Sequence, residues 1–143
     1  MNLEQRLRAL LRSRFARFGA VGAAGFLVDE AVLTLAHYAF GLDPYLARAI
    51  SIFCAMTFTW WGNRTLTFAE HAASGGAAEL AGEWFKFVLA NAVGALVNYA
   101  AYTLLVTFAP HPLGHPLVAT AIGVGVGLVF NFTLSKRFVF KAD

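Results

Sequence analysis

The chain has 143 residues, of which 59% are hydrophobic and 13% charged, whereas about a quarter of the residues in a soluble domain carry charge. Its net charge of +3 comes from 11 lysines and arginines against 8 acids, and most of the basic residues flank apolar stretches. This composition argues against a soluble domain and against a nucleic-acid-binding surface. It predicts an all-α integral membrane protein.

The first segment, residues 2–16, is expected to form a helix that lies on the membrane surface. Apolar side chains recur there at helical spacing, with arginines between them. The apolar positions are Leu3, Leu7, Leu10, Leu11 and Phe15, and the basic ones are Arg6, Arg8, Arg12 and Arg14. The alternative is an ordinary solvated basic segment.

Four long apolar stretches follow, each near the roughly 20 residues that a helix needs to cross about 30 Å of hydrocarbon. They are Phe18–Phe40, Tyr45–Trp61, Phe85–Phe108 and Leu117–Ser135. We therefore expect one domain over residues 1–143 with four transmembrane helices and a linker at about 69–83. A cleaved leader explains the first stretch less well, because its apolar sequence continues to Phe40.

The basic residues predict an orientation in the membrane. Of the 11, only Arg48 falls on the side opposite to the two termini and the linker. The positive-inside rule therefore places both termini and the linker in the cytoplasm. The expected location is the cytoplasmic, or inner, membrane, crossed several times.

The apolar part of the chain contains an internal repeat. A shift of 69 residues superposes Phe18 on Phe87, Gly25 on Gly94 and Asp29 on Asn98. A shift of 72 then superposes a second set, which is Pro44 on Pro116, Ala47 on Ala119, Arg64 on Lys136 and Phe68 on Phe140. We expect two two-helix repeats, at about 15–68 and 84–140. Since each would begin and end on the same side, the repeats should be parallel in the membrane.

Polar residues inside the spans are the first candidates for function. Asp29 lies about 16 Å along a helix from Phe18, near the bilayer midplane, where a charge costs at least about 2.5–3.5 kcal/mol. It should therefore face the protein interior, a partner or water, and the adjacent Glu30 should face elsewhere. We predict an intramembrane polar path formed by Asp29, Asn98, Asn63, Asn91 and Asn131. The alternative for each is a hydrogen bond that fixes helix packing.

Basic residues at the cytoplasmic span ends are the second candidates. The predicted lipid-phosphate-binding set is Arg17, Arg64, Lys86, Lys136 and Arg137. The alternative is that these residues only mark topology and extend to the interface. Arg48 is expected either to contact a phosphate on the outer side or to pair with Asp43.

Catalytic and metal-binding patterns were not recognised in the sequence, so we expect no enzyme activity, cofactor or metal site. Three prolines keep His111 and His115 from forming a helical ligand pair, and Cys54 is the single cysteine.

Short motifs in both halves resemble the GtrA-like family of membrane proteins. In the first half these are Arg17-Phe18-x-x-Val21-Gly22 with Asp29, and then Asn63-Arg64-x-x-Thr67-Phe68. In the second half they are Lys86-Phe87 with Asn98, Asn131-Phe132, and Lys136-Arg137-Phe138-Val139-Phe140. The resemblance covers residues from about 14 to 140, although Ser135 stands where the first half has Asn63.

This resemblance implies a small four-helix protein that moves a polyprenyl-phosphate-linked monosaccharide across the membrane for the synthesis or modification of cell-surface polysaccharide. It also implies a separate glycosyltransferase partner that makes the lipid-linked sugar. Small residues on the helix faces suggest a homodimer embedded among membrane lipids. Two alternatives stay open, a non-transporting scaffold that recruits the glycosyltransferase and a small exporter of the multidrug type.

Overall fold

The computed structural model describes residues 1–143, apart from the side chains at 10, 11, 44, 45, 116 and 117. The predictions made for the side chains of Leu10, Leu11, Pro44 and Pro116 therefore lie outside the described residues. Every regular element in the described chain is helical. The chain forms two compact units, unit 1 over Met1–Ala72 and unit 2 over Ala73–Asp143.

Unit 1 begins with the short helix α1 (Leu3–Arg12), which ends sooner than the sequence pattern predicts. The Ser13 side chain accepts a hydrogen bond from the backbone N–H of Ala16 at 3.1 Å and so caps the next helix, α2 (Arg14–Thr34). Residues 14–16 therefore belong to α2 rather than to the surface helix. On α1, Leu3 and Leu7 are exposed, as a membrane-surface helix requires.

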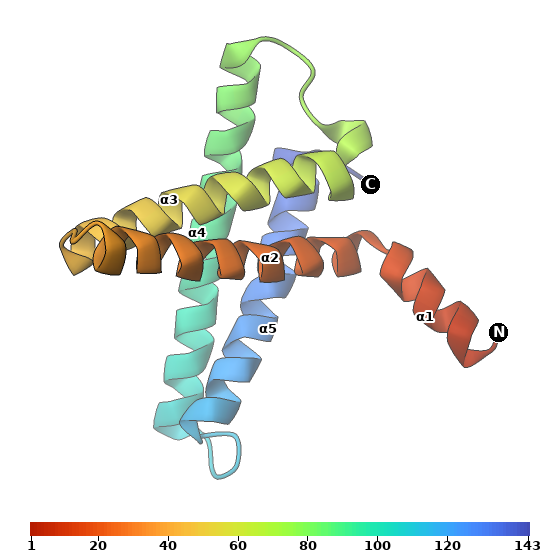
Figure 1. Ribbon diagram of the computed structural model, residues 1–143. Coiled ribbons are helices and arrows are strands. Elements are labelled where there is room, and N and C mark those ends of the chain that lie inside the picture. The colour runs from red at the N-terminus through yellow and green to blue at the C-terminus, as the bar shows by residue number, and fades with distance from the viewer. The chain divides into compact units, whose positions relative to one another are not determined.

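Helices α2 and α3 (Pro44–Gly62) form an antiparallel hairpin in unit 1 (Figure 1). A π-helical turn over Leu35–Ala39 extends α2, and Gly41 then reverses the chain with a φ of 67°. Only glycine adopts that left-handed conformation without steric cost, which explains its place in this turn. The Asp43 carboxylate accepts a hydrogen bond from the backbone N–H of Leu46 at 3.3 Å and so caps the start of α3.

Unit 2 is a second antiparallel pair, formed by α4 (Ala77–Phe108) and α5 (Pro116–Leu134). With 32 residues, α4 is about 48 Å long, so its first turns project beyond the end of α5 (Figure 1). The helix begins within the expected linker, well before the apolar stretch that starts at Phe85. Gly127 allows a close approach, because a Cβ there would lie 3.0 Å from the backbone oxygen of Gly94.

Edge-to-face phenylalanine pairs close the hairpin of each unit at one end. The ring centroids of Phe18 and Phe68 are 6.4 Å apart, and those of Phe87 and Phe140 are also 6.4 Å apart. Each pair follows a π-helical turn, over Asn63–Thr67 in unit 1 and over Ser135–Val139 in unit 2. The aromatic pairs are largely buried, so the small core of each unit lies along its helix–helix seam.

Large apolar side chains cover the outer faces of both units. Exposed examples are Phe26, Leu27, Phe53, Leu96 and Leu104. Three helical segments are long and apolar enough to cross a membrane, and they are Arg14–Ala39, Ala77–Phe108 and Val118–Val139. The protein is thus a multi-pass membrane protein. In the described residues, α3 is not among the three because Arg48, two threonines and two tryptophans lower its hydropathy, so the fourth span stays a prediction.

Candidate functional site

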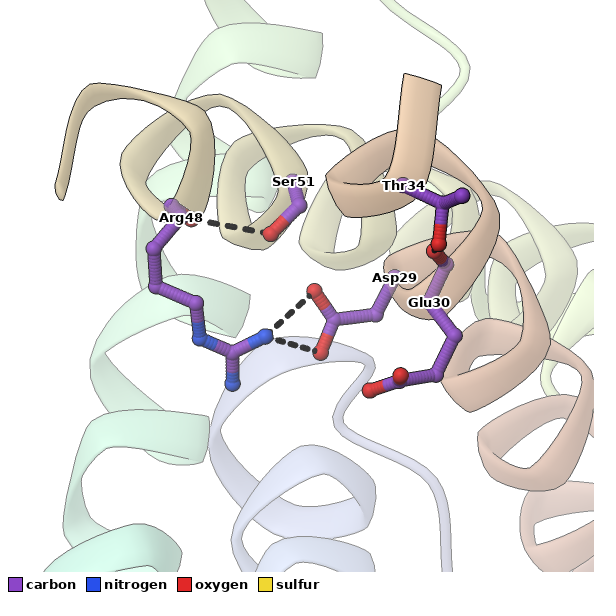
Figure 2. A network of polar contacts seen from close by, with 5 residues as sticks. All are labelled: Asp29, Glu30, Thr34, Arg48 and Ser51. Atoms are coloured by element: carbon purple, nitrogen blue, oxygen red, sulfur yellow. Dashed lines mark hydrogen bonds and ion pairs between the residues drawn. The ribbon is translucent and has the colours of Figure 1, made fainter. Parts of the chain in front are cut away.

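An ion pair joins the two helices of unit 1 in the half of the hairpin nearer the Gly41 turn. Nη1 of Arg48 on α3 donates to both carboxylate oxygens of Asp29 on α2, at 2.8 Å and 2.7 Å (Figure 2). The Asp29 side chain is only 15% exposed, whereas that of Arg48 is 48% exposed. Because each charge alone would cost about 2.5–3.5 kcal/mol in hydrocarbon, pairing makes the insertion of both helices less costly.

Polar side chains around this pair bond mainly to their own helices. Ser51, which is fully buried, donates its hydroxyl to the backbone oxygen of Arg48 at 3.0 Å. Thr34 does the same to the backbone oxygen of Glu30 at 2.7 Å (Figure 2). Within the described residues, the Glu30 carboxylate itself is exposed and has no ion-pair partner. Asp29 and Glu30 thus place two adjacent carboxylates near Arg48, and Arg48 forms its ion pair with Asp29.

The partner of Arg48 corrects one of the two expectations for that residue. The sequence offered Asp43 as the nearby acid, but Asp43 caps α3 and the guanidinium binds Asp29 instead. Sequence reasoning missed this contact because the two residues are 19 positions apart and meet only through the register of the hairpin. The available signal was that they stand on opposite sides of the Gly41 turn.

A largely apolar groove lies between α2 and α3 toward the other end of unit 1. Its volume is about 390 Å³, and Arg17 is the one charged residue that lines it. The remaining lining residues are Ala20, Val21, Ala24, Phe58, Gly62 and Leu66. The groove exists because alanines and a glycine stand where larger side chains would fill the seam; Val21 already packs closely against Gly62.

A smaller pocket of about 90 Å³ continues from the charged end of this groove. Arg17 and Leu66 line both cavities, and Arg14 and Glu70 add polar walls to the smaller one. Nη2 of Arg14 lies 4.0 Å from Oε2 of Glu70, at the limit of an ion pair. An apolar groove that ends at an arginine beside a polar pocket suits an amphiphile with an anionic head. Arg14 was expected only on the surface helix, so its place in this pocket was not foreseen.

Arg64, the other predicted phosphate ligand of unit 1, lines neither cavity. Its guanidinium carbon lies 5.5 Å from the ring centroids of both Trp60 and Trp61. Arginine over an aromatic ring gains a cation–π attraction, and tryptophan is the strongest such partner. In unit 1, therefore, Arg17 is the predicted cation that lines a cavity.

The predicted cations of unit 2 gather at one end of that unit. Lys86 precedes Phe87, while Lys136 and Arg137 lie on the π-helical turn that leads to Phe140, and the two phenylalanine rings are in contact. Lys86 and Arg137 are exposed and Lys136 is partly exposed. Binding of lipid phosphate by these cations stays a prediction.

Two of the predicted path asparagines are held by their own helices. Asn63 is buried and its side-chain oxygen accepts from the Thr67 hydroxyl at 2.8 Å. The Asn91 amide donates to the backbone oxygen of Phe87 at 2.9 Å. These bonds satisfy polar groups one helical turn apart and fix side-chain positions.

Asn98 and Asn131 lie in the seam between α4 and α5. A Cβ on Gly123 or Gly127 would collide with Asn98, and one on Gly94 would collide with the side chain of Asn131. In the described residues the Asn131 side-chain oxygen is buried without a hydrogen-bond partner, as is the Ser135 hydroxyl one turn further on. These two side chains, together with that of Asn98, give the seam of unit 2 a polar character. A continuous path with Asp29 stays a prediction.

A comparison with known protein families identifies the family of this chain. The family model described as GtrA/DPMS, transmembrane domain, matches residues 17–142. That range covers most of both units and includes the apolar groove and the Asp29–Arg48 pair. No curated protein matches the chain significantly.

Proposed function

Since this chain belongs to the GtrA/DPMS transmembrane family, we propose that it binds a polyprenyl-phosphate-linked monosaccharide and moves it across the cytoplasmic membrane. The transported lipid would serve the synthesis or modification of cell-surface polysaccharide. The family is generally non-catalytic, and transport requires binding and release rather than bond making. A separate glycosyltransferase would make the lipid-linked sugar.

The observation that carries this proposal is the pairing of an apolar groove with Arg17. A polyprenyl phosphate has a branched apolar tail and an anionic phosphodiester next to the sugar. The tail fits along the alanine-lined groove, while Arg17 can donate charge-assisted hydrogen bonds to the phosphate. The polar pocket with Arg14 and Glu70 then lies where the sugar hydroxyls would extend.

Transport also requires the hairpin of unit 1 to cross the membrane completely. Helix α3 runs along α2 from the contact of Gly62 with Val21 to the Asp29–Arg48 pair, which supports a span for α3 beside that of α2. The neutralised pair lets α3 enter despite its arginine. We therefore propose four spans in two parallel repeats, with both termini and the linker in the cytoplasm.

The remaining partners belong to the same proposal. Each unit would present its own predicted cations to lipid phosphates at the inner headgroup layer, Arg17 and Arg64 in unit 1 and Lys86, Lys136 and Arg137 in unit 2. Gly22 on α2 and Gly125 on α5 face open space and leave room for a second copy. Cross-linking in native membranes would detect such a homodimer, and monomers alone would contradict it.

Binding of a defined lipid tests the proposed function. The purified chain in phosphatidylcholine nanodiscs is titrated with geranylgeranyl phosphate, and the Arg17→Gln variant is compared with Arg6→Gln, a control on α1 that lies outside both cavities. Loss of one charge-assisted interaction should weaken binding by about tenfold or more in Arg17→Gln only. Equal affinity in all three proteins would contradict the proposal and favour a scaffold that recruits the glycosyltransferase.

A further inference from the structure

The guanidinium of Arg48 is only partly used by its ion pair. Asp29 engages Nη1 alone, and among the described contacts neither Nε nor Nη2 of Arg48 has a partner. Figure 2 shows the other terminal nitrogen pointing away from the carboxylate. The Nε–Nη2 edge is the planar fork that binds two oxygens of a phosphate at once. With the side chain 48% exposed, this edge is accessible.

Helix packing alone does not account for the ion pair. At the corresponding positions of unit 2, the sequence shifts of 69 and 72 place Asn98 and Thr120, which carry no charge. Helices α4 and α5 still pack closely there, because Gly123 and Gly127 admit the Asn98 side chain. A neutral pair therefore suffices for a hairpin of this kind, and the two charges of unit 1 call for another explanation.

We propose that Arg48 is a second phosphate-binding site. Its Nε–Nη2 edge binds the phosphate of the lipid, while Nη1 stays hydrogen-bonded to Asp29. This inference rests on the proposed function and adds a second site along the route of the lipid. The ligand class is a phosphate mono- or diester on a prenyl chain.

Asp29 determines how strongly this site binds. A phosphate that approaches Arg48 meets a guanidinium whose charge is already neutralised, and the exposed Glu30 adds a further negative charge beside it. Arg17, in contrast, has no ion pair among the described side chains. Arg17 should therefore bind phosphate tightly and Arg48 weakly. Asp29 follows Arg17 by 12 positions, which separates the two sites by about 18 Å along α2.

The chain itself provides the control variant. Replacing Asp29 with Asn and Arg48 with Thr gives unit 1 the neutral residues of unit 2 and removes both charges of the pair together, so neither is left without its partner. If the pair only holds the hairpin together, this double variant should bind and transport normally. If Arg48 binds phosphate, the double variant should fold but lose the second site.

The test measures geranylgeranyl phosphate binding in the Arg17→Gln background, where the first site is removed. We expect residual weak binding that Asp29→Asn tightens by about tenfold, because the competing carboxylate is gone. The double replacement of Asp29 and Arg48 should abolish it. Thermal unfolding of each variant in detergent shows which ones are folded. If Asp29→Asn alone is unstable, the loss of residual binding in the folded double variant tests the role of Arg48.

Two further probes identify the ligand and separate the possible failures. Inorganic phosphate and geranylgeraniol should each bind far more weakly than the complete lipid, and equal binding of inorganic phosphate would overturn a lipid site. Residual binding that survives the double replacement would overturn the role of Arg48, while the effect of Arg17→Gln on the wild-type background would still support the proposed function. A wild-type protein that binds no prenyl phosphate would overturn both.

Discussion

The close approach of α4 and α5 at Gly127 gives the most quantitative prediction for the fold. Replacing Gly127 with Ala adds a Cβ that would lie 2.9 Å from the Asn98 Cβ and 3.0 Å from the Gly94 oxygen. Ordinary contact begins at 3.4 Å, so the helices must separate by 3.4 − 2.9 = 0.5 Å. Neither neighbour can move away by itself, because one is a backbone atom and the other is attached directly to the backbone.

Gly125→Ala is the matched control for this change. A Cβ at Gly125 meets nothing within 4 Å, so that variant gains only the helix propensity of alanine, about 1 kcal/mol. Gly127→Ala gains the same amount but also incurs an overpacking cost of about 1–3 kcal/mol. The free energy of unfolding should therefore be lower for Gly127→Ala than for Gly125→Ala by about 1–3 kcal/mol, the packing cost alone.

Equilibrium unfolding in mixed micelles with increasing SDS, followed by circular dichroism, measures this difference. Because both variants exchange glycine for alanine two residues apart on α5, effects on the unfolded state largely cancel. If Gly127→Ala were as stable as Gly125→Ala, or more stable, the described seam between α4 and α5 would be wrong.

Two further predictions concern unit 1. Ala24→Leu should fill the groove and weaken geranylgeranyl phosphate binding without lowering the thermal unfolding temperature. The control is Ala23→Leu at the exposed neighbouring position, which should leave binding unchanged. Equal binding by both variants would refute the groove as the binding site. Arg64→Leu should remove its cation–π contacts, lower stability by about 0.5–1 kcal/mol and shift the tryptophan fluorescence, and an unchanged spectrum would contradict the contact with Trp60 and Trp61.

The positions of the long helices could be predicted because hydrophobic length is a local property of the sequence. The stretch expected over Tyr45–Trp61 is α3 at Pro44–Gly62, and the stretch expected over Leu117–Ser135 is α5 at Pro116–Leu134. Helix α4 begins at Ala77, before the apolar stretch, because alanine, leucine and glutamate favour a helix in its first turns without forming a long apolar run. The π-helical turns have no comparable local pattern and were not predicted.

The candidate site was only partly accessible from sequence, because it depends on the register of the hairpin. Asp29 and Arg48 were each singled out, but their mutual contact follows from how the turn at Gly41 aligns α2 with α3. Arg17 was predicted as a phosphate ligand from its position at a span end. The groove beside it depends on which small residues face the seam, and that requires three-dimensional packing.

Translocation in proteoliposomes tests the central claim most directly. Vesicles carrying the purified chain and a fluorescent short-chain prenyl-phosphate-linked sugar are treated with an impermeant quencher, so that only lipid reaching the outer leaflet loses its signal. We predict rapid quenching of nearly all of the lipid with the wild-type protein, and quenching limited to the outer-leaflet fraction with Arg17→Gln, as in vesicles without protein. Quenching limited to that fraction with the wild-type protein as well would contradict the account.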